Sequence, residues 1–180
     1  MTSLSDLIQK VNIARKKFIA VASGLTAQQT SFKPSEDRWS ITDNVEHLVW
    51  AEMGGINGMW KVLNATKAGQ SVYAGELTHR GKSIEEIVAL TWKEKETVPE
   101  IAKPRWGGPV EYWIEALNNN QHLLERLGKE MANENPEKII HPHPISGPLN
   151  VIQRLEFLRF HLERHQKQME RIKSEKNYPN

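Results

Sequence analysis

The chain has 180 residues, a length that fits one domain with a buried core. Lys and Arg total 24 against 22 Asp and Glu, a net charge of only +2, and no stripe of basic and aromatic residues favours nucleic-acid binding. There is no cysteine, which excludes disulfides, thiolate metal ligands and cysteine nucleophiles. We therefore predict a single domain over residues 1–180.

The same composition gives no sign of a membrane protein. No apolar run approaches the roughly 20 residues that a transmembrane helix needs. Residues 1–6 have neither the basic nor the apolar region of a secretory signal. The lack of cysteine fits a reducing compartment, so a cytoplasmic protein with no membrane partner is expected.

The first strong periodicity predicts an amphipathic helix from about Leu4 to Leu25. Apolar residues recur there at alternating intervals of three and four positions, which is typical of a helix that packs along one face: Leu4, Leu7, Val11, Ala14, Phe18, Val21 and Leu25. A short helical piece should follow, and Pro34 should end it.

A second helix is predicted from Ser40 to about Ala68. Ser40 followed by Asp43 is a variant of the capping box that starts helices, and Gly69 is a natural stop. Three glycines inside a helix each cost about 1 kcal/mol against alanine. They indicate a close helix–helix approach, a kink or room for a ligand: Gly54, Gly55 and Gly58.

The rest of the chain alternates helices with connections. No strand-like alternation is evident, and the pattern predicts an all-α four-helix bundle with an extra short helix in the crossover. The expected segments are a polar loop (70–82), a short helix (Ser83 to about Thr97), a loop (98–109), a long helix (about Val110 to Met131), a proline-rich connection (136–148) and a last helix (about Leu149 to Ser174).

Two histidines in the last helix are the strongest chemical signal. His161 and His165 lie four residues apart, so their side chains project from one helix face, one turn apart. Two imidazoles so placed can bind one metal ion. His165 also occupies a position in the apolar seam where leucine is expected. The alternative is a pair of hydrogen-bonded core histidines, which would need buried polar partners.

A third histidine lies in the second predicted helix. His47 shares a face with Asp43 one turn earlier and with Gly54 and Gly58 further on. One imidazole, one carboxylate and little bulk describe a pocket wall better than a packed core, although a surface histidine is the simpler reading of His47 alone. Besides capping the helix, Asp43 is a candidate to hydrogen-bond His47 and so orient its ring toward a metal.

Two further residues are candidates for the wall of this pocket. His143, in the proline-rich segment with His141, either reaches the pocket rim as a proton carrier or substrate contact, or lies in an exposed loop. Arg154 lies two turns before His161 on the same helix face. It either binds an anionic substrate or forms a salt bridge at the edge of the seam.

Three other residues have weaker assignments. Trp106, in a loop rich in proline and glycine, is a candidate cover for the pocket mouth. His79 and His122 belong to no cluster in the sequence, and both are predicted to lie on the surface.

Three motifs together resemble the DinB-like superfamily. Trp39 to Leu48 (WSITDNVEHL) is similar to the segment that carries its first metal ligand, His143 to Leu149 (HPISGPL) to the loop before its last helix, and His161 to Gln168 (HLERHQKQ) to its C-terminal ligand helix. The resemblance spans nearly the whole chain, in order and spacing. It implies a four-helix bundle that often forms a homodimer and holds one divalent ion, often zinc or nickel, with His47, His161 and His165.

Three functions are compatible with these residues. The first is a metal-dependent enzyme acting on a small molecule, either a hydrolase or an S-transferase that uses a low-molecular-weight thiol, because three imidazoles leave a position open on the metal. The second is a non-catalytic protein that binds a metal or small ligand, which the lack of an evident general base favours. The third is a structural bundle with histidines in its core.

Overall fold

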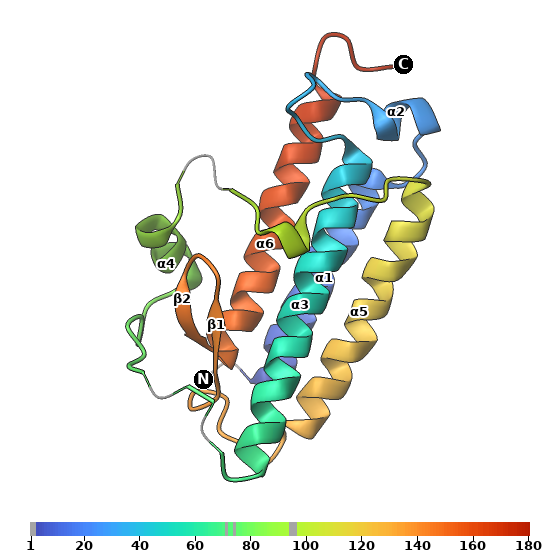
Figure 1. The fold of residues 1–180 in the computed structure, drawn as a ribbon. Helices are drawn as coiled ribbons and strands as arrows, with labels where there is room; N and C mark the ends of the chain where they lie inside the picture. The colour runs from blue at the N-terminus through green and yellow to red at the C-terminus, as the bar shows by residue number, and fades with distance from the viewer. Residues whose placement is uncertain (1–2, 71, 74, 94–96) are drawn as a thin grey trace.

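The segments with helical periodicity form four long helices that lie side by side (Figure 1): α1 (Leu4–Ala22), α3 (Ile41–Lys67), α5 (Val110–Glu130) and α6 (Val151–Lys173). This is a computed structural model, and it describes residues 3–70, 72–73, 75–93 and 97–180. Helices α1 and α3 each pack against both α5 and α6. The chain is therefore mostly helical, as the sequence predicts.

Capping residues set where the helices begin. The side chains of Ser3, Ser40 and Asn150 accept a hydrogen bond from the backbone N–H three residues on, in capping boxes that open α1, α3 and α6. Helix α1 ends at Ala22, three residues before the predicted end, because Ser23 is extended and Gly24 has a φ of 72°.

The short elements differ from the prediction in two places. Helix α4 (Ile84–Thr91) ends well before Thr97, with an extended Trp92 as its cap; residues 94–96 of the predicted helix lie outside the described residues. The proline-rich connection contains an antiparallel hairpin of strands β1 (Ile140–His143) and β2 (Gly147–Asn150), so the prediction of no strands was wrong. Four-residue strands that contain prolines are too short to show alternation in a sequence.

Two further short helices complete the described fold. Helix α2 (Ala27–Ser31) follows α1, and the 3-10 helix η1 (Glu100–Ala102) lies in the crossover between α4 and α5. In Figure 1 this crossover passes over α3, while α4 and the hairpin lie beside α6. These segments cover one side of the α3–α6 contact.

The core fills the space between the four long helices. One face of α5 and one face of α6 are buried in this core, and apolar residues dominate both faces: Val110, Trp113, Leu117, Asn120, Leu124 and Leu127 on α5, and Val151, Leu155, Leu158, Leu162, His165, Met169 and Ile172 on α6. None of the described helices combines the length and the apolar character that crossing a bilayer requires.

One buried ion pair joins three of these helices. The Arg15 guanidinium of α1 lies 2.8 Å from the Glu52 carboxylate of α3, and both side chains are 1% exposed. Arg15 also donates to Gln121 Oε1, and Asn120 Nδ2 donates to Glu52 across 3.4 Å. Burial raises the pKa of Glu52, although Arg15 opposes this. Removing either Arg15 or Glu52 would therefore leave an uncompensated charge in the core.

Arg15→Met should be strongly destabilising because it leaves the Glu52 carboxylate buried without its cation, a cost of about 3–5 kcal/mol. The double variant Arg15→Met/Glu52→Leu should recover most of that loss. Chemical denaturation measures both, and Arg126→Met, which breaks the exposed pair with Glu130, is the control that should cost about 1 kcal/mol or less. Equal losses in the single and double variants would contradict the assignment.

Candidate metal centre

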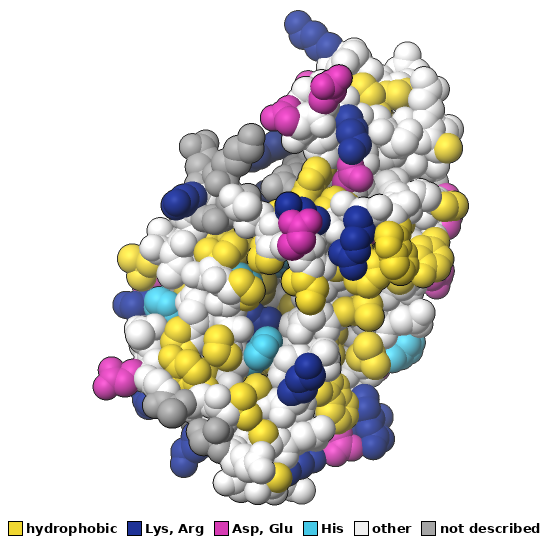
Figure 2. All heavy atoms as spheres, in the orientation of Figure 1, with side chains coloured by type: hydrophobic (Ala, Val, Ile, Leu, Met, Phe, Trp, Pro, Cys, Tyr) yellow, Lys and Arg dark blue, Asp and Glu magenta, His cyan; other side chains and the backbone are white. Residues whose placement is uncertain are grey.

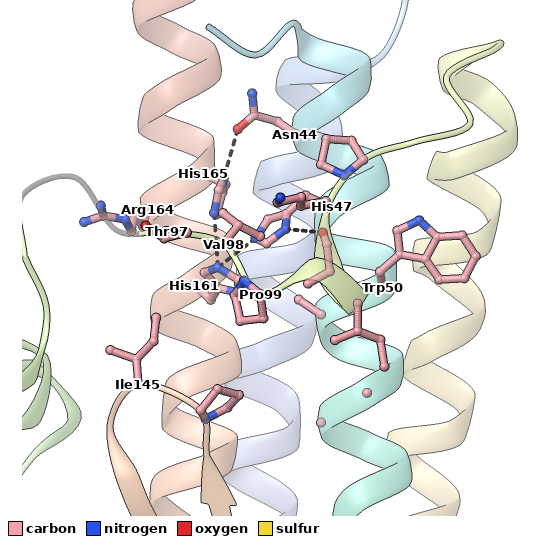
Figure 3. A pocket seen from close by; sticks show the side chains of 18 of the residues that line it. Asn44, His47, Trp50, Thr97, Val98, Pro99, Ile145, His161, Arg164 and His165 are labelled. Carbon is pink, nitrogen blue, oxygen red and sulfur yellow. Dashed lines mark hydrogen bonds between the residues drawn. The ribbon is translucent and has the colours of Figure 1, made fainter. Parts of the chain in front are cut away.

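The structure brings together the three histidines that the sequence places on two helices. His47 comes from α3, and His161 and His165 come from consecutive turns of α6 (Figure 3). The Nε2 atom of His161 lies 3.2 Å from that of His47 and 3.1 Å from that of His165. All three side chains are buried, with exposures of 4–6%. Their potential ligand atoms lie within 4.8 Å of one another.

Hydrogen bonds fix the orientation of two of the rings. His47 Nδ1–H donates to the Ala102 carbonyl oxygen of η1 across 2.7 Å, and His165 Nδ1–H donates to Asn44 Oδ1 across 2.8 Å. Both acceptors are oxygens that can only accept, so the proton of each neutral ring lies on Nδ1. Each Nε2 therefore presents a lone pair toward the other histidines, as ligand histidines with outer partners do.

This donor set fits a metal ion. A neutral His161 can offer a hydrogen from Nε2 to one of the two facing lone pairs but not fully to both, and its Nδ1 is buried without a partner. A cation between the three nitrogens satisfies all of them. In a tetrahedral zinc site the ligand nitrogens lie about 3.3 Å apart, close to the 3.1 and 3.2 Å separations found here.

The rings are uncharged at neutral pH, as metal binding requires. Burial lowers the pKa of His47 to about 4, and it lowers the pKa values of His161 and His165 well below the ordinary value. The neighbouring imidazoles reinforce the shift of the His161 pKa. Three neutral imidazoles thus meet in this site, and none of them carries a second N–H proton at neutral pH.

The histidines line a cavity of about 770 Å³. This volume suits a small organic ligand. Aromatic rings surround the cluster: Trp39 lies 4.9 Å from the His47 ring, and Phe157 lies 5.3 Å from the His161 ring. Figure 2 shows histidine side chains among hydrophobic ones near the centre of the molecular face that it draws. Aromatic side chains therefore form part of the cavity wall beside the cluster.

Glu46 holds the crossover segment over the site. Its buried carboxylate accepts hydrogen bonds from the backbone N–H groups of Arg105, Trp106 and Gly107, at 2.7–2.9 Å, and from Trp50 Nε1. Burial alone raises the pKa of Glu46, but these donors hold it below its ordinary value. Because Ala102 lies just before this anchored stretch, Glu46 helps to position the carbonyl that orients His47.

His143 lines the cavity wall, which agrees with its interpretation as a pocket residue and not with an exposed loop. Its Nδ1 accepts the backbone N–H groups of Ile145 and Ser146, at 3.2 and 3.1 Å, which places the ring proton on Nε2. Its ring packs 4.2 Å from Phe157. Burial lowers the pKa of His143 to about 3, so the ring offers a fixed Nε2–H donor and no proton acceptor at Nδ1.

The glycines of α3 make room for side chains from the other elements. A methyl group at Gly55 would lie 2.8 Å from Arg154 Nη2, and one at Gly58 would overlap the His141 ring. A methyl group at Gly54, which lines the cavity, would meet nothing within 4 Å. Arg154 itself is buried and lines the cavity. Of the three interpretations given for these glycines, room for a ligand fits Gly54, whereas the space at Gly55 and Gly58 is taken by the Arg154 and His141 side chains.

Other candidate residues lie elsewhere. The Asp43 carboxylate caps α3 and pairs with Lys33, whereas its neighbour Asn44, which the sequence reasoning did not single out, contacts His165. Trp106 packs on Trp50 and Trp113 and does not line the cavity.

The two remaining histidines have different surroundings. His79 is partly buried and bonds to the Ser146 carbonyl, so its prediction as a surface residue was wrong, whereas His122 is exposed as predicted. The partner of His79 lies 67 residues away in the chain, in the turn of the hairpin, which explains why no local pattern shows this contact.

Asn44→Ala should weaken metal binding by about 10–100-fold, because it removes the acceptor that orients His165 without touching a ligand. Asp43→Asn is the matched control on the next residue: it retains a helix-capping oxygen and should bind metal as the wild type does. Competition with a chromophoric chelator measures both affinities. Equal affinities in the two variants would contradict the role of Asn44.

The stability of the metal-free protein should fall with pH in part through His143. Between about pH 6.5 and pH 3 the unfolded chain binds this proton and the folded chain does not, so each pH unit lost removes about 1.4 kcal/mol, with no effect above that window. His143→Asn keeps an acceptor for the two N–H groups and should flatten the slope by one proton. Denaturant titrations of the wild type and the variant between about pH 7 and pH 5 test this, and equal slopes would contradict the role of His143.

Comparison with known proteins agrees with this geometry. No curated protein sequence matches the chain. Residues 11–169 match the family profile of the DinB superfamily, a span that runs from α1 into α6 and includes all three clustered histidines. Since the match covers most of the chain and confirms the resemblance seen in its motifs, the chain belongs to the DinB superfamily.

Proposed function

We propose that this chain is a metal-dependent enzyme that binds one divalent transition metal, zinc or nickel, and acts on a small molecule. The observation that carries the proposal is the convergence of three buried, neutral imidazole Nε2 atoms at a cavity wall. Three protein ligands and an open position are the pattern of catalytic rather than structural metal sites.

The chemistry depends on what the metal adds to these residues. A divalent ion bound here lowers the pKa of a water or thiol in its open position and so supplies a nucleophile at neutral pH. The Ala102 carbonyl and Asn44 hold two of the candidate ligand rings in place, and the aromatic side chains of Trp39 and Phe157 pack beside the cluster. His143 Nε2–H is available as a hydrogen-bond donor to a substrate.

Transfer of a low-molecular-weight thiol is the reaction that the site supports best. The thiol's sulfur attacks an electrophilic carbon, a carbon–sulfur bond forms, the leaving group departs with the electron pair, and the thiol proton passes to solvent. This reaction needs no protein carboxylate as base. Asp37 is the one acidic residue among the described lining residues, and it lies in the loop before α3. Because the chain has no cysteine, the thiol is a cosubstrate.

Hydrolysis is the second candidate. It is supported by the donor set itself, because three imidazoles around zinc are also the ligands that activate water in carbonic anhydrase. A non-catalytic protein that binds a metal or small ligand remains the alternative that the experiments below separate from both.

The assembly belongs to the same proposal. We expect the four long helices to form a four-helix bundle of the DinB type and the chain to pair as a homodimer. Exposed aromatic and aliphatic side chains on the crossover and α5, Ile101, Trp106 and Tyr112, support a partner surface. Sedimentation of the purified protein measures the oligomeric state.

Elemental analysis of untagged protein, purified without chelator, should find about one equivalent of a transition metal. The double variant His47→Ala/His161→Ala should contain none. His122→Ala, which changes an exposed histidine on α5, is the control that should keep the full content. No metal in the wild type, even after reconstitution with zinc and nickel, would remove the basis for the enzyme proposal.

The metal-loaded protein is then screened for turnover. Thiol transfer is assayed with cysteine, N-acetylcysteine and cysteamine against chlorodinitrobenzene, and hydrolysis with nitrophenyl esters and anilides. Activity that needs both metal and thiol, and that the double variant lacks, supports transfer. Activity on the esters or anilides without thiol supports hydrolysis, and metal binding with neither activity favours the binding protein.

A further inference from the structure

We propose that Arg154 forms an anion-binding end of the cavity and that its ligand is a small organic molecule carrying a carboxylate or phosphate group. The identification of this ligand as the substrate rests on the proposed function. The anion site itself rests on the surroundings of one guanidinium, on the charge of the cavity wall and on its place along α6.

Among the residues that the structure describes, none provides a counterion for the buried Arg154 guanidinium. The side chain is 4% exposed, and its Nε and Nη1 atoms are buried with no hydrogen-bond partner. Its Nη2 atom lies beside the backbone at Gly55, and the centroid of the Phe157 ring lies 5.8 Å from Cζ. Arginine is almost never buried in this state unless something pairs with it. The missing partner is therefore an anion.

No described carboxylate takes that place. Burial lowers the pKa of Arg154 to about 10, and no acidic group offsets this, so the group stays charged at neutral pH. Two histidines of the cavity wall, His141 and His143, have pKa values that are lowered by burial and further by the charge of Arg154. The rings beside the guanidinium are therefore neutral and leave its charge uncompensated.

The described cavity wall is cationic as a whole. Its one acidic member, Asp37, faces five basic ones: Arg38, Lys103, Arg154, Arg164 and Arg171. Arg38 is paired with Glu175 outside the lining. A cavity with apolar walls and one sign of charge concentrates ligands of the opposite sign. The field of the cavity and the unpaired guanidinium thus favour the same class of ligand.

Arg154 lies in line with the metal ligands. It precedes His161 by seven residues, or two helical turns, so the two Cα atoms are roughly 10 Å apart along α6. Both side chains line the same cavity. A ligand that reaches both therefore has its reacting atom and its anionic group several bonds apart. The Phe157 and Leu158 side chains between them suit an apolar linker.

The anion site is tested in metal-free protein with three probes: butyrate, inorganic phosphate and the neutral amide butyramide. Calorimetric titration should show binding of at least one of the anions, and butyramide should bind at least tenfold more weakly. Arg154→Met should bind the anion about 10–100-fold more weakly, because it loses the charge-assisted hydrogen bonds of the guanidinium. The anion that binds more tightly distinguishes a carboxylate from a phosphate ligand.

Two variants separate binding from a structural role. Without anion, Arg154→Met should unfold at the wild-type temperature or above it, because it removes an unpaired buried charge, and the anion-induced rise of the midpoint should vanish. Arg154→Gln should lose the same anion response. Arg126→Met, on the outer face of α5, is the control that should keep it.

Three results would overturn the inference: no anion binding by the wild type, unchanged binding in Arg154→Met, or a midpoint of that variant far below the wild type. Because the probes are measured without metal, this outcome is independent of the elemental analysis. If the protein binds anions through Arg154 but binds no metal, the anion site is supported and the enzyme proposal is contradicted. If the protein binds metal but no anion, only the metal site is supported.

Discussion

The candidate site depends on three imidazole rings that share one small buried volume while each stays uncharged. Burial lowers the pKa values of all three, so protons do not hold the cluster together at neutral pH. His47 and His165 each donate their single N–H hydrogen, on Nδ1, to an oxygen outside the cluster. Their two Nε2 lone pairs face His161, which can offer at most one hydrogen, so a cation is the partner that makes this arrangement favourable.

The surrounding structure keeps those rings in place. The backbone carbonyl that orients His47 belongs to the crossover, a segment without long helical structure of its own. Glu46, one residue before His47 on α3, fixes that crossover with three backbone hydrogen bonds. One turn of α3 thus supplies the candidate ligand His47, the acceptor Asn44 for the candidate ligand His165, and Glu46, which anchors the segment that orients His47.

Most of the helical fold and the histidine cluster could be predicted from the sequence. Long amphipathic periods and capping boxes are local signals, and His161 and His165 are neighbours on one helix turn. Even His47 could be singled out from the sequence as a possible pocket residue, because its helix face lacks bulky residues.

What the sequence could not show are contacts between distant segments. The partner of His47 is a backbone carbonyl 55 residues away, which any residue type provides, and Arg15 meets Glu52 only after α1 and α3 pack. The hairpin escaped because prolines and four-residue strands leave no periodic signal. Asn44 was missed for a related reason: in the sequence, the adjacent Asp43 is the more conspicuous polar group, and only the packed helices show which of the two faces His165.

Charge balance connects the two ends of the cavity. Three imidazoles are neutral ligands, so they leave the charge of a divalent ion uncompensated, unlike sites that contain thiolates or carboxylates. Arg154 adds a further unpaired positive charge two helical turns away. A neutral ligand would leave both charges without a counterion in apolar surroundings, which is costly. A molecule that brings a negative sulfur or oxygen to the metal and an oxyanion to Arg154 compensates both. The selectivity of the site for such a molecule would therefore come from the scarcity of acidic residues in the described cavity wall, where Asp37 is the one carboxylate, as much as from the basic residues that the wall contains.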